Sequence, residues 1–229
     1  IELARVEPIS ELTASIAFAI ASIHNLPKEL VQKSGFPELD PHENLKYRVM
    51  ELDRAAQTGK VPPILLQRWE TALEDSSMFR YQPTVVHGAI NGHSVLELDG
   101  KVSGVLHWSG LRISDPAEDL SWVLGGATTD LAKNLIARYF EARPGADVNL
   151  WSRALLYSEL ELARWLLHGY SQGSQEIIED AVGMLLVLTE EVESGKAERI
   201  TAAPLATELA QQRRAEEAST NPVKNDELF

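Results

Sequence analysis

The sequence predicts a globular fold of the α+β class that is mainly helical. Apolar residues recur at helical spacing along most of its 229 residues. A single stretch, 84–108, combines β-branched runs with a hairpin signal. Hydrophobic residues make up 44% of the chain and charged residues 24%, proportions that disfavour disorder. We therefore expect one domain over residues 1–197, followed by a polar, partly disordered tail over 198–229.

Three helices are predicted before the β-rich stretch. The first spans 9–26, where isoleucines and leucines recur every three or four residues until Pro27. Residues 28–41 contain a glycine and two prolines and are predicted to form a loop. A second helix is expected over 42–57 and a third over 63–74, the latter opened by a proline pair, because proline is tolerated in a first turn.

Residues 84–108 are predicted to form one small sheet between helical blocks. Two short apolar runs precede Asp99-Gly100, a dipeptide typical of a tight hairpin turn. The chain then returns as a strand from Lys101 to Trp108.

The rest of the chain is predicted to be a helical block over 117–195. Its helices are expected at 117–125, 128–142, 148–170 and 174–195. Beyond Gly195 the composition becomes polar, and 198–214 is a candidate surface helix.

Charge and composition exclude several classes of function. The formal net charge of −13 is unsuited to a phosphate backbone or an anionic membrane surface, so neither nucleic acid nor membrane is an expected partner. The absence of cysteine excludes disulfides, thiolate nucleophiles and cysteine-based metal sites. No apolar run reaches the ~18 residues of a membrane span, and no leader peptide is visible. A cytoplasmic protein is the expectation.

An ordered set of motifs lies between residues 87 and 119. It consists of His87-Gly88, Val95-Leu96, the Asp99-Gly100 hairpin, Trp108, Asp115-Pro116 and Asp119-Leu120. This order resembles the aminoglycoside and macrolide phosphotransferase family, which has the protein-kinase-like fold. The resemblance covers roughly residues 9–195 and implies the C-terminal lobe of that fold. Only eight residues precede the first expected helix and no glycine-rich phosphate loop is present, so we expect the N-terminal lobe to be absent from this chain.

The resemblance also implies that the catalytic residues are lost. The family's catalytic Asp falls on Ala89, its metal-binding Asn on Ser94, and the metal-binding Asp after the hairpin on His107. Phosphoryl transfer depends on positioning the reactants and on neutralising charge with Mg²⁺, which prefers hard oxygen ligands. We therefore expect no intact catalytic residue, no metal and no cofactor; an active enzyme would use ATP or GTP with magnesium.

Several residues near the hairpin admit two interpretations. His87 could be a general base, but in the resembled fold it more often braces the catalytic loop. Asp115 and Asp119 could bind metal, but we favour Asp119 as a cap on loop N–H groups and Asp115, with Pro116, as a helix start. His24 and His168 lie near helix ends and need no function. His87, His93 and His107 could form a zinc site, although their spacing matches no known ligand pattern.

The favoured function is a degraded phosphotransferase retained as a binding or regulatory module. Its partner would be a protein, a second copy of the chain or a small molecule. The alternative is an active small-molecule phosphotransferase whose N-terminal lobe lies outside this chain. Three acidic residues are candidates for an amine-bearing ligand or for surface charge: Glu159, Glu161 and Asp180. An open apolar edge, to be covered by a partner, is expected at hairpin residues Val95, Leu96, Val105, Leu106 and Trp108.

Overall fold

The computed structural model describes residues 1–202 and is mainly helical, as predicted, with two small antiparallel sheets. The candidate helix at 198–214 and most of the predicted tail lie outside the described residues. The α-helices are α1 Glu11–His24, α2 Lys28–Lys33, α3 Pro41–Gln57, α4 Pro63–Glu74, α5 Ala117–Gly126, α6 Thr129–Ala142, α7 Leu150–Gln172 and α8 Gln175–Glu193.

Short polar residues fix where several helices begin. Ser10 accepts a hydrogen bond from Thr13 N–H at the start of α1, and Thr128 and Ser174 cap α6 and α8 in the same way. At the start of α3, Asp40 and Glu43 form a reciprocal capping box. These caps explain why the observed helices begin within two residues of most of the predicted starts.

The β-structure differs from the single predicted sheet. The hairpin β2 Val95–Leu98 and β3 Lys101–Val105 is present, but β1 Thr84–Val86 pairs instead with β4 Arg112–Ser114. The prediction missed β4 because three residues are too few to show alternation. Trp108 was predicted at the end of a strand, yet it begins a 3-10 helix, Trp108–Gly110.

Residues 28–41 were predicted to be a loop, and this was wrong for their first part. Lys28–Lys33 forms the short helix α2, which begins directly after Pro27. A helix of six residues carries too little periodicity to be recognised, and its buried face is a single side chain, Val31.

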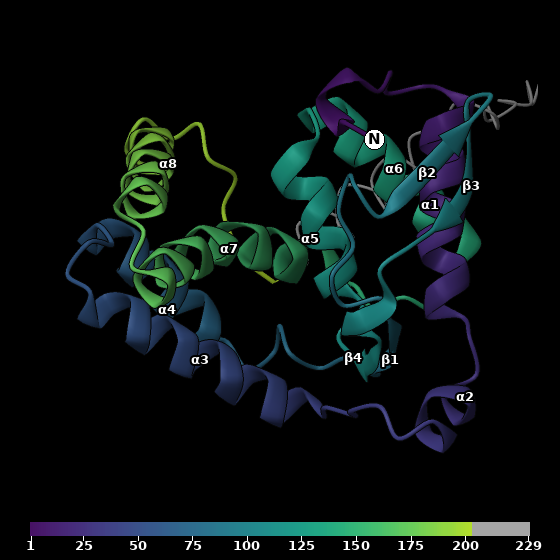
Figure 1. The fold of residues 1–229 in the computed structure, drawn as a ribbon, viewed down its shortest axis with the longest axis horizontal. Coiled ribbons are helices and arrows are strands. Elements are labelled where there is room, and N and C mark those ends of the chain that lie inside the picture. The colour runs from purple at the N-terminus through teal and green to yellow at the C-terminus, as the bar shows by residue number, and fades with distance from the viewer. Residues whose placement is uncertain (203–229) are drawn as a thin grey trace, which may run out of the picture.

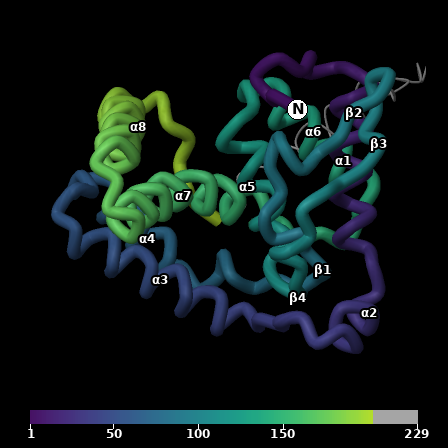
Figure 2. Tube along the Cα trace, in the orientation of Figure 1, coloured from purple at the N-terminus to yellow at the C-terminus, as the bar shows by residue number. Residues whose placement is uncertain are grey.

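The elements form one body around a continuous apolar core (Figure 1). Helix α7 packs against α5 and α8, and α3 and α4 lie beneath it. At the other side of the molecule the β2–β3 hairpin lies along α1, which in turn packs on α6. The tube in Figure 2 shows the β1–β4 pair between these two groups. The part of the motif segment next to β1 and β4 thus lies between the two groups, whereas its hairpin lies on the α1 side.

No helix in residues 1–202 is both long and apolar enough to cross a membrane.

Candidate functional site

The loop after β1 is held in a tight conformation by its neighbours. His87 is fully buried, and Gly88 has a φ of +75°, in the left-handed region that favours glycine. A Cβ at position 88 would clash with the guanidinium of Arg112 and the carbonyl oxygen of Gly110. Ala89 follows and is exposed. The sequence therefore places a bare methyl group where this constrained loop meets solvent.

Asp119 anchors this loop from the first turn of α5. Its carboxylate accepts hydrogen bonds from His87 N–H at 2.7 Å and Gly88 N–H at 2.8 Å. It also accepts one from His24 Nε2 at 3.1 Å, and His24 Nδ1 lies 2.8 Å from the hydroxyl of Tyr139. The predicted cap is thus present. His24, for which no function was expected, has a structural role that the sequence did not predict: its ring is buried and joins α1 to the carboxylate.

The environment of Asp119 favours its ionised form. Burial alone would raise the pKa of this carboxyl group, but the hydrogen bond and charge of His24, with the two backbone N–H donors, outweigh it and hold the pKa below its ordinary value. All three of these contacts are with the protein itself. The carboxylate is therefore occupied in positioning the loop.

Both ring nitrogens of His87 are used within the fold. Nε2 lies 2.8 Å from the carbonyl oxygen of Leu106, and Nδ1 accepts a 3.3 Å hydrogen bond from Ala89 N–H. The ring also packs on Trp108, with centroids 4.7 Å apart. These contacts tie the loop to the chain after β3 and leave neither nitrogen directed at a ligand, which fits a bracing role.

The other two positions matched to the family's metal ligands offer little to a metal. Ser94 is buried, and its hydroxyl both donates to the carbonyl oxygen of Asn91 and accepts from Asn91 N–H, at 2.8 Å each. The Asn91 side chain accepts from the N–H groups of His93 and Ser94 and so closes a local turn. His107 is exposed, with a φ of 65°. It supplies an imidazole and no carboxylate.

The proposed histidine trio is not brought together. Within residues 1–202, no three histidine or carboxylate side chains converge in a way that could hold a metal ion. His87 is instead turned toward Leu106 and Trp108.

Asp115 belongs to a buried network that the sequence did not predict. Arg153 of α7 donates to both carboxylate oxygens, at 2.7 and 3.1 Å, and Tyr157 donates at 2.9 Å. Ala117 N–H donates to the same carboxylate, which agrees with the predicted role at a helix start. Arg153 and Asp115 are both fully buried. The only available signal was an arginine within the apolar face of a core helix, a weak indication of an ion pair.

An open cleft of about 680 Å³ adjoins the loop. Residues of α3 and α7 line most of it, and Gly88, Arg112 and Glu118 at the start of α5 also line it. Four arginines and two glutamates line it: Arg48, Arg54, Arg112, Arg164, Glu51 and Glu118. None of the acidic residues proposed for an amine-bearing ligand lines this cleft.

Those acidic residues are engaged elsewhere. Glu159 is buried and accepts hydrogen bonds from Arg68 and from Trp69 Nε1, the latter at 2.7 Å. Glu161 pairs with Arg164 on its own helix, and Asp180 accepts from Trp165 Nε1. Glu159 is therefore not a surface charge.

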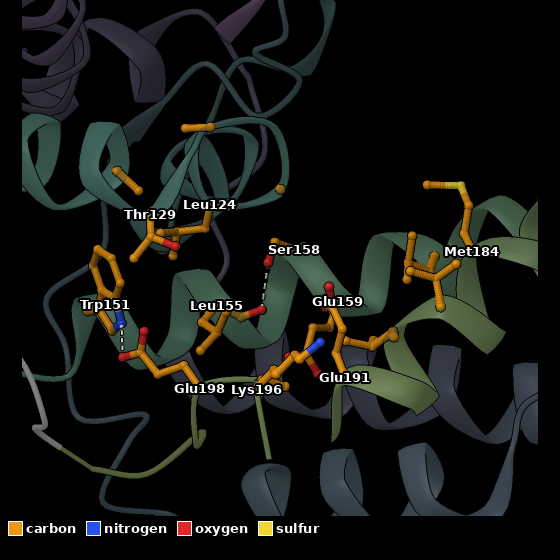
Figure 3. A pocket seen from close by; sticks show the side chains of 17 residues that line it. Leu124, Thr129, Trp151, Leu155, Ser158, Glu159, Met184, Glu191, Lys196 and Glu198 are labelled. Atoms are coloured by element: carbon orange, nitrogen blue, oxygen red, sulfur yellow. Dashed lines mark hydrogen bonds between the residues drawn. The ribbon is translucent and has the colours of Figure 1, made fainter. Parts of the chain in front are cut away.

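A second cavity of about 590 Å³ lies between α5, α7 and α8 (Figure 3). Its walls are mainly apolar, and Glu159 and Lys196 are among its polar side chains. The indole N–H of Trp151 donates to Glu198 at 2.7 Å at one end. No residue between 87 and 119 lines it, so this cavity is separate from the loop.

Comparison with known proteins shows which family the chain resembles in sequence. The profile described as "Phosphotransferase enzyme family" matches residues 2–157. The curated protein YcbJ of Bacillus subtilis (strain 168) is 23% identical over 150 residues, which cover 64% of this chain and 47% of YcbJ. The chain thus spans about half the length of that relative.

Solved structures agree on the fold. The macrolide 2'-phosphotransferase MphH of Brachybacterium faecium matches with a TM-score of 0.67 at 21% identity, over 79% of this chain and 61% of MphH. A type I macrolide 2'-phosphotransferase matches with a TM-score of 0.69 at 26% identity, over 79% of this chain and 60% of that protein. The GDP complex of aminoglycoside 2'-phosphotransferase IIIa matches with a TM-score of 0.62 at 19% identity, over 82% of this chain and 64% of that protein. Since the profile spans well over half of the chain, the protein belongs to the phosphotransferase enzyme family and has its kinase-like fold.

Proposed function

We propose that this protein is a catalytically degraded member of the phosphotransferase family that acts by binding. The observation that carries the proposal is the side chains at the three matched positions. Ala89 has no oxygen, the hydroxyl of Ser94 is occupied by Asn91, and His107 presents an imidazole. Phosphoryl transfer needs a group that orients the nucleophile and oxygen ligands for Mg²⁺. These residues do not fit a magnesium–nucleotide site.

The retained contacts support a role for the scaffold without the chemistry. The Asp119 cap and the His87 brace hold the loop through hydrogen bonds inside the protein. Neither contact depends on a metal or a nucleotide. The loop can therefore keep its shape as part of a binding surface. The partner would be a protein, a second copy of the chain or a small molecule.

The alternative is an active enzyme acting on a small molecule. One solved relative is a complex with GDP. An active form of this protein would accordingly use ATP or GTP with magnesium, and the lobe that covers the nucleotide would lie outside this chain.

A phosphate-transfer assay on the full gene product tests the proposal. Labelled ATP and GTP are offered with Mg²⁺ or Mn²⁺ and with a macrolide and an aminoglycoside as acceptors. We expect no transfer above buffer, and no thermal shift with nucleotide. A ligand at a hundred times its dissociation constant would stabilise the fold by about 2.7 kcal/mol, which is readily measured. Transfer that is lost on replacing His107 by alanine would overturn the proposal and favour the active enzyme.

A further inference from the structure

The cleft beside Gly88 has a charge opposite to that of the whole molecule. The chain carries a formal net charge of −13, yet four arginines and only two glutamates line this cleft. The arginines come from three separate parts of the chain: Arg48 and Arg54 from α3, Arg112 from β4 and Arg164 from α7. The fold therefore gathers positive charge at one place.

The inner part of this cluster is built around Glu118. This side chain is only 5% exposed and lies between two guanidinium groups, with Arg48 Nη2 on one side at 3.2 Å and Arg112 in direct contact on the other. Arg112 also donates to the carbonyl oxygen of Gly110 at 2.8 Å. The single carboxylate of Glu118 thus pairs with two guanidinium groups.

The outer part repeats the pattern with Glu51. Arg164 pairs with Glu51 at 2.9 Å, while Arg48 is 3.7 Å from the same carboxylate. Arg164 also pairs with Glu161 at 2.5 Å, but Glu161 is half-exposed and does not line the cleft. A pair of that kind, within one helix and in solvent, contributes little.

Arg48 has a hydrogen-bonding capacity that the protein does not use. Within residues 1–202, its Nε is the only buried side-chain nitrogen or oxygen without a hydrogen-bond partner. Burial alone would lower the pKa of Arg48, but Glu118, Tyr157 and Glu51 raise it above its ordinary value, so the guanidinium stays charged. A buried polar atom that lacks a partner in the chain is commonly met by a water molecule or an ion.

Arg54 adds a free positive charge to the lining of the cleft. Its side chain is exposed, and it forms no ion pair with the described residues. Guanidinium groups bind carboxylates and phosphates with paired hydrogen bonds, and they do so better than they bind neutral groups.

We propose that this cleft binds a small anionic molecule that carries a carboxylate or a phosphate group. Its volume of about 680 Å³ is within the usual range for small-molecule sites. The exposed ring of Tyr47 and the side chain of Leu167 supply apolar wall for the body of the ligand. This inference adds a ligand class to the proposed function. It rests on that function only because it assumes that the cleft is the binding site.

Four sugars that share the glucose ring and differ in charge test the charge preference. Glucuronate carries a carboxylate, glucose 6-phosphate a phosphate, glucosamine a positive charge, and glucose no charge. Dissociation constants are measured by NMR titration of the full gene product at constant ionic strength, without nucleotide. We expect at least one anionic sugar to bind about tenfold or more tightly than glucose and glucosamine. Comparison of the two anions distinguishes a carboxylate from a phosphate ligand.

The matched variants are Arg54→Gln in the cleft and Arg138→Gln on the exposed face of α6. Because it removes one exposed charge from the cleft, Arg54→Gln should weaken binding of the preferred anion about threefold to fivefold. Arg138→Gln removes an exposed charge outside the cleft and should leave binding unchanged. The proposal is overturned if neither anion binds, if glucosamine binds most tightly, if all four sugars bind alike, or if both variants behave alike. Because no phosphate transfer is measured, failure here is distinct from failure of the proposed function.

Discussion

Asp119 is the residue on which the shape of the loop depends most directly. Replacing it by alanine would leave the N–H groups of His87 and Gly88 and one nitrogen of His24 without their acceptor. An unmet buried donor costs roughly 1–3 kcal/mol. We therefore expect Asp119→Ala to lower the free energy of unfolding by at least that amount, as measured by urea denaturation. Asp53→Ala, at an exposed position on α3, is the control. Equal urea midpoints for the two variants would contradict the capping role.

The same carboxylate predicts a pH dependence. Its pKa is lowered in the folded state, mainly because His24 and two backbone N–H groups outweigh the effect of burial. A group of this kind contributes stability above its unfolded pKa of about 3.9, and the contribution is lost as the pH falls through the lower folded value.

Unfolding of the wild type and of Asp119→Asn should thus be followed by urea denaturation from pH 7 to pH 2. We expect the stability difference between them to be constant above about pH 5 and to shrink below about pH 4. A difference that stays the same across this range would show that the charge of Asp119 does not stabilise the fold.

Individual residues show why the site was only partly predictable. The cap by Asp119 followed from the order of motifs in the sequence. The part played by His24 did not, because it depends on α1 packing beside α5 and α6, 95 and 115 residues away from its two partners in the chain. Arg153 was missed for the same reason, since its partner Asp115 lies 38 residues earlier.

At the scale of elements, Arg153 joins α7 to the start of α5 and to the segments before β1 and α7. It donates to Asp115, to Asp147 and to the carbonyl oxygen of Met78. Removing one partner of a buried ion pair typically costs about 3–5 kcal/mol, because the other charge is left uncompensated. We expect Arg153→Met to lower the free energy of unfolding by that amount.

Calorimetric melting checks this expectation. Arg153→Lys should restore little, because an ammonium cannot reproduce the paired hydrogen bonds to Asp115. Arg138→Met on the surface of α6 controls for the loss of an exposed arginine. If Arg153→Met melts at the temperature of that control, the network does not hold the helices together.

Element length decided which parts of the fold could be predicted. The helices of ten or more residues were all recognised, because each presents several turns of apolar periodicity. The six-residue α2 and the three-residue β4 were not, since neither is long enough to show a period. β4 is defined by its pairing with β1, Thr84 with Ser114 and Val86 with Arg112, which the local sequence does not encode.

The charge of the cleft is a property of the whole molecule. Its arginines stand at positions 48, 54, 112 and 164, and only the fold brings them together. Read along the chain, each of them resembles an ordinary surface charge. The candidate ligand-binding residues chosen from the sequence were instead acidic, and the structure places them outside this cleft. The charge of this cleft was therefore among the least predictable features of the protein.

The hairpin presents apolar side chains through which the whole chain could associate. The hairpin was expected to present an open apolar edge, and the structure bears this out only in part. Val95 is buried and Val105 and Trp108 pack on a small core cluster, but Leu96 is 44%, Leu106 42% and Leu98 64% exposed. Exposed apolar side chains gathered on one element favour contact with another protein surface.

We expect the chain to self-associate through this hairpin, and light scattering over a concentration series to show a rising mean mass. The net charge of −13 keeps the chain soluble without covering the leucines, so solubility alone tests nothing. Replacing Leu98 and Leu106 by glutamine should lower the mass to that of a monomer. The same change at Leu186 and Val187, which are 53% and 58% exposed on α8, should leave it unchanged. A chain that is monomeric at every concentration would count against the hairpin as an interface, and equal effects of the two pairs would mean that association depends on general hydrophobicity.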